Sequence, residues 1–236
     1  MTLITLTSCI SVDYDLDFVP HFIEHYSNLD IDRFKLILHS NREFNILDHF
    51  HLFKPVHKKV ELIKWVGGFN GQDKVDKLNE LQTEGHIITT DVDEFQVWNK
   101  PIKQNTGVIW GKLRDREPTV NSLPEITTDN IYQQFPLVTK KSNWGRGLFK
   151  PCLYPHTLKL LSPHHLQDNE PDEANYIDID HFRWAQGRLE KSIERLENYK
   201  TLNNQGRRMY KYYHRFPTTD LQNVIDEYSD VTKPKI

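Results

Sequence analysis

Apolar positions in residues 1–98 follow two alternating periods. Short, apolar, β-branched segments have the character of buried strands, and they lie at residues 3–10, 34–39, 60–65 and 86–90. Between these segments, apolar residues recur at helical spacing, within residues 18–29, within residues 44–53, and after the glycine-rich turn 67–71. We expect Asp17 to cap the first helix, with Pro20 in its first turn, and Gly85 to end the third.

Strands and helices that alternate in this way predict an α/β fold. A βαβ repeat of roughly thirty residues requires crossover connections, so the strands should be parallel with helices on both faces of the sheet. In such sheets ligands bind beyond the carboxyl ends of the strands. The segment that follows the fourth strand, 91–95, reads DVDEF and is therefore the first place to look for chemistry.

The pattern is looser beyond residue 98, where prolines divide the chain into short pieces. We expect strands at 107–113 and 147–154, a helical turn at 130–135, a helix at 184–200, and a basic, aromatic stretch at 207–215. The prediction is a single domain over residues 1–236. It divides into residues 1–98, residues 99–200 and a C-terminal extension, residues 201–236.

Composition excludes several classes of protein. The 236 residues carry 30 Lys and Arg against 33 Asp and Glu, a net charge of −3 that provides no basic field for nucleic acid. No apolar run reaches the roughly 18 residues of a membrane span, and the N-terminus has no secretory pattern. Two cysteines, Cys9 and Cys152, cannot form a disulfide scaffold, so we expect a reduced, cytoplasmic compartment.

Asp91 and Asp93 are the strongest candidates for chemistry. Residues two apart in a strand point the same way, so two unpaired carboxylates would repel and raise each other's pKa. A hard cation such as Mn²⁺ or Mg²⁺ relieves that repulsion and completes its shell with phosphate oxygens. His164 and His165 follow in a loop, and a neutral imidazole from one of them is a suitable third ligand. Glu94 should face away from Asp93 and pair with a Lys or Arg.

The segment IITTDVDEF, residues 87–95, resembles the D-x-D-E-F segment of GT-A fold nucleotide-sugar glycosyltransferases, in the family 2 and family 92-like group. Further short similarities are GVIWGKLRDREP at 107–118, QFP at 134–136, LFKPCLYP at 148–155, the histidines 164–165, and HFRWAQGRLEKSIERL at 181–196. The second strand ends in His39-Ser40-Asn41 instead of the acidic residue common in family 2.

The resemblance implies transfer of a sugar from a UDP- or GDP-linked donor to a carbohydrate or other hydroxyl acceptor. Residues 1–98 would then be the nucleotide-binding half of the domain and residues 99–200 its acceptor half. The cation would bind Asp91, Asp93 and a histidine and stabilise the departing diphosphate. An inverting transfer needs a carboxylate base, for which Asp115 is the candidate and Glu117 and Asp180 are reserves. A retaining enzyme would need no such base.

The remaining candidates concern the nucleotide. Ser8 and Cys9 come near the end of the first strand and should border the base. The turn 67–71 has neither P-loop nor dinucleotide-binding spacing, but Gln72 and Lys74 after it could reach the nucleotide. Two other functions stay open: an inactive nucleotide- or carbohydrate-binding protein of the same fold, and an aspartate-dependent phosphatase. The phosphatase would need its D-x-D on the first strand.

Overall fold

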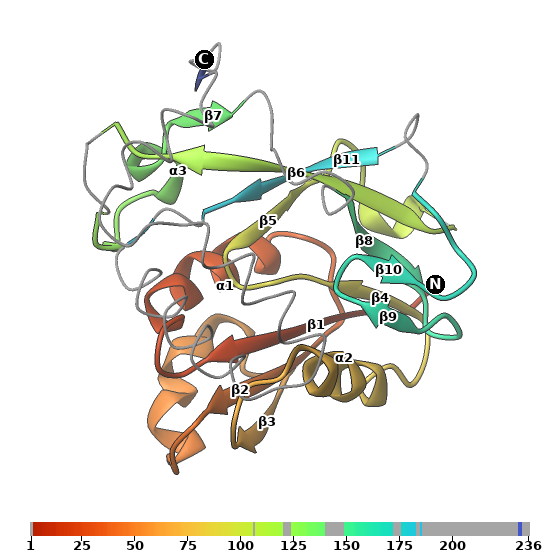
Figure 1. Ribbon diagram of the computed structural model, residues 1–236, viewed down its shortest axis with the longest axis horizontal. Helices are drawn as coiled ribbons and strands as arrows, with labels where there is room; N and C mark the ends of the chain where they lie inside the picture. The colour runs from red at the N-terminus through yellow and green to blue at the C-terminus, as the bar shows by residue number, and fades with distance from the viewer. Residues whose placement is uncertain are drawn as a thin grey trace. The chain divides into compact units, whose positions relative to one another are not determined.

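A computed structural model describes residues 2–105, 107–119, 124–139, 149–171, 176–182, 185 and 231–232 (Figure 1). The chain forms two compact units. The first comprises Met1–Arg114 and Trp144–His181, and the second Asp115–Asn143 and Phe182–Ile236. The single glycosyltransferase domain stays a prediction. The expected helix at 184–200 and the basic stretch at 207–215 lie outside the described residues, except for Ala185.

The first unit is built on four parallel strands, which confirms the expected α/β fold class. Their order across the sheet is β3-β2-β1-β4. Within it β1 pairs in parallel with both β2 and β4, and β2 with β3. The bounds are β1 Ile4–Ser11, β2 Arg33–Ser40, β3 Val60–Val66 and β4 His86–Thr89. All four strands were predicted to within one or two residues.

Beyond β4 the sheet becomes antiparallel, so the whole sheet is mixed. β8 pairs antiparallel with β4 and β6, and β11 pairs antiparallel with β5. Two very short strands, β9 and β10, form a separate hairpin. The bounds are β5 Glu94–Val97, β6 Ile109–Glu117, β8 Phe149–Pro155, β9 Leu160–Ser162, β10 His165–Leu166 and β11 Tyr176–His181.

Helices lie on both faces of the parallel strands, as predicted. On one face, Cys9, Ile37 and Ile87 pack in one apolar cluster with Val75 and Leu78 of helix α2. On the opposite face, the alternate strand residues are also buried, and helix α1 covers them. The helices are η1 Leu16–Phe18, α1 Val19–Ser27, η2 Ile46–Val56, α2 Gly71–Glu80 and η3 Ile102–Gln104, of which η1, η2 and η3 are 3-10 helices.

Two predicted helix ends were wrong. Asp17 does not cap α1, because a 3-10 turn precedes that helix and Phe18 occupies the N-cap position. Pro20 does lie in the first turn, as expected. Gly85 does not end α2, whose C-cap is Leu81. Gly85 instead has φ +71 immediately before β4, and a Cβ at this position would lie 2.3 Å from the Leu3 carbonyl oxygen.

The second unit contains the end of β6, residues 115–117, with β7 Leu137–Thr139, β12 Val231–Thr232 and helix α3 Ile131–Gln134. β7 pairs antiparallel with β6 and with β12. Phe182 packs edge-on against Tyr132 and Phe135, which gives this unit an aromatic core. Among the described residues, no helix has both the length and the apolar character needed to cross a membrane.

Candidate functional site

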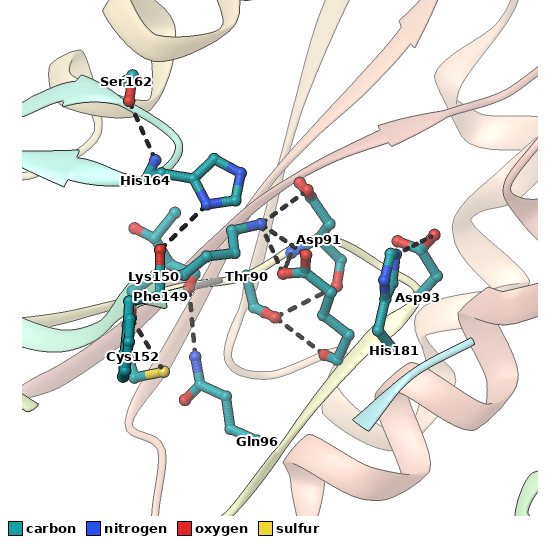
Figure 2. Close-up of polar contacts among 12 residues, drawn as sticks. Thr90, Asp91, Asp93, Gln96, Phe149, Lys150, Cys152, Ser162, His164 and His181 are labelled. Carbon is teal, nitrogen blue, oxygen red and sulfur yellow. Dashed lines mark hydrogen bonds and ion pairs between the residues drawn. The ribbon is translucent and has the colours of Figure 1, made fainter. Parts of the chain in front are cut away.

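The D-V-D-E segment lies at the carboxyl edge of the parallel strands, directly after β4. β4 ends at Thr89, and residues 92–93 form a turn that is closed by a bond from the Glu94 N–H to the Asp91 carbonyl oxygen at 3.1 Å. The expectation that Asp91 and Asp93 share one strand face is therefore wrong. In a turn, side chains two apart need not point the same way, and Figure 2 shows Asp91 and Asp93 directed to different neighbours.

Helix α1 stabilises this turn through hydrogen bonds of its residue Tyr26. The Tyr26 hydroxyl donates to the Glu94 carbonyl oxygen at 2.9 Å and lies 3.2 Å from the Thr90 hydroxyl. It also accepts from the Gln96 N–H at 3.1 Å. Tyr26 and Thr90 are almost fully buried. The Thr90 side chain before the turn and the backbone of Glu94 and Gln96 after it are thus bonded to one buried phenol, which holds the turn in place.

Four charged side chains, Lys74, Asp91, Glu94 and Lys150, gather at the turn and are called the charged cluster below. The Lys150 ammonium group donates to Asp91 Oδ2 at 3.0 Å and to both carboxylate oxygens of Glu94 at 2.7 Å (Figure 2). The Lys74 ammonium group donates to Asp91 Oδ1. The predicted pairing of Glu94 with a lysine or arginine is confirmed.

The electrostatics of the charged cluster keep most of it ionised. Burial alone would raise the pKa of Asp91, but Lys150 and Lys74 outweigh burial and hold that pKa well below its usual range. The pKa of Lys150 is raised: burial opposes the charge, and Asp91 and Glu94 together favour it more strongly. Burial raises the pKa of Glu94 despite its contact with Lys150. The cluster combines two lysines with two carboxylates, so the formal charges of its side chains cancel.

Asp93 belongs to a separate contact. Its Oδ2 lies 3.6 Å from Nε2 of His181 (Figure 2). His181 is on β11, where it pairs with Glu94 of β5. Earlier on β11, Asp178 and Asp180 accept from Arg114 at 2.6 and 2.5 Å. Asp180, the other reserve base, is 1% exposed and is paired with Arg114, whose side chain is 29% exposed.

The two adjacent histidines occupy different environments. Nδ1 of His164 lies 3.1 Å from the Phe149 carbonyl oxygen, beside Lys150 on the same strand (Figure 2). Burial, assisted by the nearby charge of Lys150, lowers the pKa of His164 to about 4. His165 is exposed and bonds the Ser162 hydroxyl at 2.7 Å. Only His164 lies near the charged cluster.

The depressed pKa of His164 predicts a pH-dependent stability. The unfolded chain binds a proton on this histidine near pH 6.5 and the folded chain only near 4, so the free energy of unfolding should fall as the pH drops through that range. Between pH 6.5 and pH 4 we expect this histidine to lower the free energy of unfolding by on the order of 2 kcal/mol, and His164→Gln should abolish that decrease. Urea unfolding between those pH values measures it. His165→Gln is the matched control and should follow the wild type; equal slopes in all three proteins would contradict the assignment.

The residues predicted to bind the cation make other contacts in this structure. Both oxygens of Asp91 already accept from ammonium groups, Asp93 faces His181, and His164 directs Nδ1 to a carbonyl oxygen. Within the described ranges, no group of three or more His, Cys, Asp or Glu is placed to hold a metal ion. The donor set Asp91, Asp93 and His164 or His165 therefore stays a prediction from sequence.

The other predicted site residues are placed as follows. Ser8 and Cys9 are buried and alternate on β1; the Ser8 hydroxyl has no hydrogen-bond partner among the described residues, and Cys9 packs in the apolar cluster under α2. Gln72 lies in the first turn of α2 and donates to Asp76, away from the charged cluster. Lys74 is in the cluster. Asp115 belongs to the second unit, where it is 5% exposed and lies within β6, not at its end.

Sequence reasoning missed Lys150 as a member of the site. It is a single lysine inside the apolar strand FKPCLYP, and a charge in such a strand is rarely buried without an opposite charge. That signal could have assigned it. Tyr26 was also missed, since its spacing on α1 marks it only as a core residue.

No family model matches the chain, and no curated protein matches it. Solved structures with similarity include the CTP:phosphocholine cytidylyltransferase LicC from Streptococcus pneumoniae, with 11% identity and a TM-score of 0.35 over 66% of each chain. HddC from Yersinia pseudotuberculosis has 13% identity and a TM-score of 0.37, over 82% of this chain and 79% of HddC. TarS from S. aureus has 10% identity and a TM-score of 0.39, over 94% of this chain and 45% of TarS. At such low similarity no residue roles are transferred from these proteins.

Proposed function

We propose that this protein is a glycosyltransferase that moves a sugar from a UDP- or GDP-linked donor to a hydroxyl group of a carbohydrate acceptor. The observation that supports the proposal is the charged cluster at the carboxyl edge of β4. Open α/β sheets bind their ligands at this edge, and the cluster is built from the D-x-D-E-F segment. Lys74 and Asp91 form its more solvent-accessible part, with side chains 11% and 31% exposed.

In the proposed reaction, the acceptor oxygen attacks the anomeric carbon of the donor sugar and inverts its configuration. The bond from that carbon to the diphosphate breaks, and the nucleoside diphosphate leaves with the electron pair. Asp115 takes the acceptor proton, which is the role of a general base in an inverting transfer. Because Asp91, Asp93 and His164 make other contacts in this structure, the proposed reaction includes no step on a metal ion.

The phosphatase alternative is less well supported. Its nucleophilic aspartate would have to attack phosphorus with a carboxylate oxygen, whereas both Asp91 oxygens accept from ammonium groups, which reduces their nucleophilicity. The D-x-D also follows β4, the fourth strand of the chain, and not the first. A binding protein with the same fold is distinguished from an enzyme by turnover.

A donor screen tests the proposal. Thermal shifts of the full chain are measured with UDP-, GDP- and CMP-linked sugars, each with Mn²⁺ and with EDTA, and a ligand at a hundred times its Kd should add about 2.7 kcal/mol of stability. We expect one nucleotide class to stabilise the protein and to release its nucleoside diphosphate when carbohydrate acceptors are added. Stabilisation without release would favour the binding protein, and no stabilisation by any donor would contradict the proposal.

A further inference from the structure

The charged cluster has an inner and an outer pair. Lys150 and Glu94 form the inner pair, with side chains 6% and 5% exposed. Asp91 and Lys74 form the outer pair. Asp91 joins the two pairs, because its two oxygens accept from different lysines. The part of the cluster that a ligand can reach is therefore the outer pair.

The two lysines differ in the hydrogen bonds they have left. An ammonium group carries three N–H donors. Lys150 uses its donors on Asp91 and on both oxygens of Glu94. Lys74 makes one hydrogen bond among the described residues, to Asp91, and so retains donors for a ligand.

Lys74 is also held in place before any ligand arrives. It lies in the first turn of α2, its backbone N–H donates to the carbonyl oxygen of the N-cap residue Asn70 at 3.0 Å, and its side chain is almost buried. The positive end of the α2 dipole adds to its charge. A lysine fixed by helix and carboxylate loses less side-chain entropy on binding than a free surface lysine would.

We propose that Lys74, positioned by Asp91 and Lys150, binds the diphosphate of the donor in the role that the sequence assigns to a divalent cation, so that donor binding needs no metal. This inference rests on the proposed function. Under this inference, Asp91 positions the ammonium group of Lys74 and does not bind a metal. Lys150 is the buried cation that holds Asp91 and Glu94 together.

The charges of the cluster favour binding of a diphosphate over binding of a divalent cation. A divalent ion on Asp91 would have to share that carboxylate with Lys74 and Lys150 or displace one of them. It would then lie close to two ammonium groups, and like charges in a partly buried site repel strongly. A diphosphate carries the opposite charge and can accept from Lys74 while the bonds from Lys150 to the carboxylates remain.

Calorimetric titration of the full chain with UDP and with GDP tests the inference, once in EDTA and once with excess Mn²⁺. We expect the better nucleotide to bind with dissociation constants that agree within about threefold in the two conditions. Binding with Mn²⁺ but not in EDTA would overturn the inference and leave the proposed function standing. Binding in neither condition would overturn the proposed function, and the inference with it.

Two variants assign the binding to Lys74. In EDTA, Lys74→Met should weaken nucleotide binding at least tenfold, and Lys74→Arg, which keeps a cation beside Asp91 and so protects the fold, should bind more tightly than Lys74→Met. The matched control is Lys103→Met, which removes a lysine that also contacts two carboxylates, Asp30 and Asp32, on the surface of the same unit. Wild-type affinity in folded Lys74→Met, or an equal loss in Lys103→Met, would overturn the inference.

Discussion

Lys150→Met should lower the free energy of unfolding by roughly 3–5 kcal/mol, the usual result of removing one member of a buried ion pair. The side chain of Lys150 is 6% exposed and bonds two carboxylates, at 2.7 and 3.0 Å. Methionine fills a similar volume, so the loss comes from the charge and not from a cavity. Urea denaturation of wild type and variant at neutral pH measures the difference.

The loss of stability in Lys150→Met should also depend on pH. Without Lys150, Glu94 has no ammonium group to offset its burial, and its pKa, already raised, should rise further. A raised pKa in the folded state stabilises most at low pH and less as the pH increases. The deficit of Lys150→Met should therefore be smaller near pH 5 than near pH 8, and the double variant Lys150→Met/Glu94→Gln should recover part of it.

Lys103→Met is the control for charge removal as such, because Lys103 contacts Asp30 at 3.2 Å and Asp32 at 2.9 Å but lies on the surface. Exposed ion pairs contribute little to stability, so its urea midpoint should be close to that of the wild type. If Lys150→Met were no less stable than Lys103→Met, the charged cluster would not be a buried, mutually neutralised group.

The sequence predicted the frame of the first unit well, for a clear physical reason. Three of the four parallel strands, β1, β2 and β4, are buried along most of their length, so their apolar, β-branched composition identifies them. The glycine at 85 was correctly marked as a break in the chain but was assigned to the wrong element. Its left-handed φ serves the entry to β4, and local sequence does not distinguish that from a helix end.

The sequence predicted where Asp91 lies but not which side chains contact it. Asp91 was correctly assigned to the carboxyl edge of the sheet, because strand order and burial fix where the chain emerges. The pairing of Asp91 with Asp93 failed because β4 ends at Thr89 and a turn begins. The lysines that bind Asp91 come from residues 17 and 59 positions away, and no local pattern reports contacts at such separation. Only the tertiary structure shows that Asp91 has its counter-charges within the chain.

Asp115→Asn should lower turnover by roughly 10²–10⁴-fold, the contribution typical of a general base. The amide has almost the same shape as the carboxylate but cannot accept the acceptor proton. The nucleotide interacts with other residues in the proposed reaction, so its affinity should hardly change. Turnover is measured as nucleoside diphosphate released at saturating donor and acceptor, with nucleotide affinity from calorimetry.

Glu117→Gln is the matched control for this last experiment, because Glu117 lies two residues further along β6 and is also buried, at 2% against 5% exposure for Asp115. Alternation along a strand places both side chains on the same face, so both variants perturb the same environment by one amide. If Asp115 is the base, only Asp115→Asn loses turnover while the two variants show similar melting temperatures. Loss confined to Glu117→Gln would move the base to that residue. Near-full turnover in both would point to Asp180 or to a retaining transfer, in which no carboxylate of β6 accepts the proton.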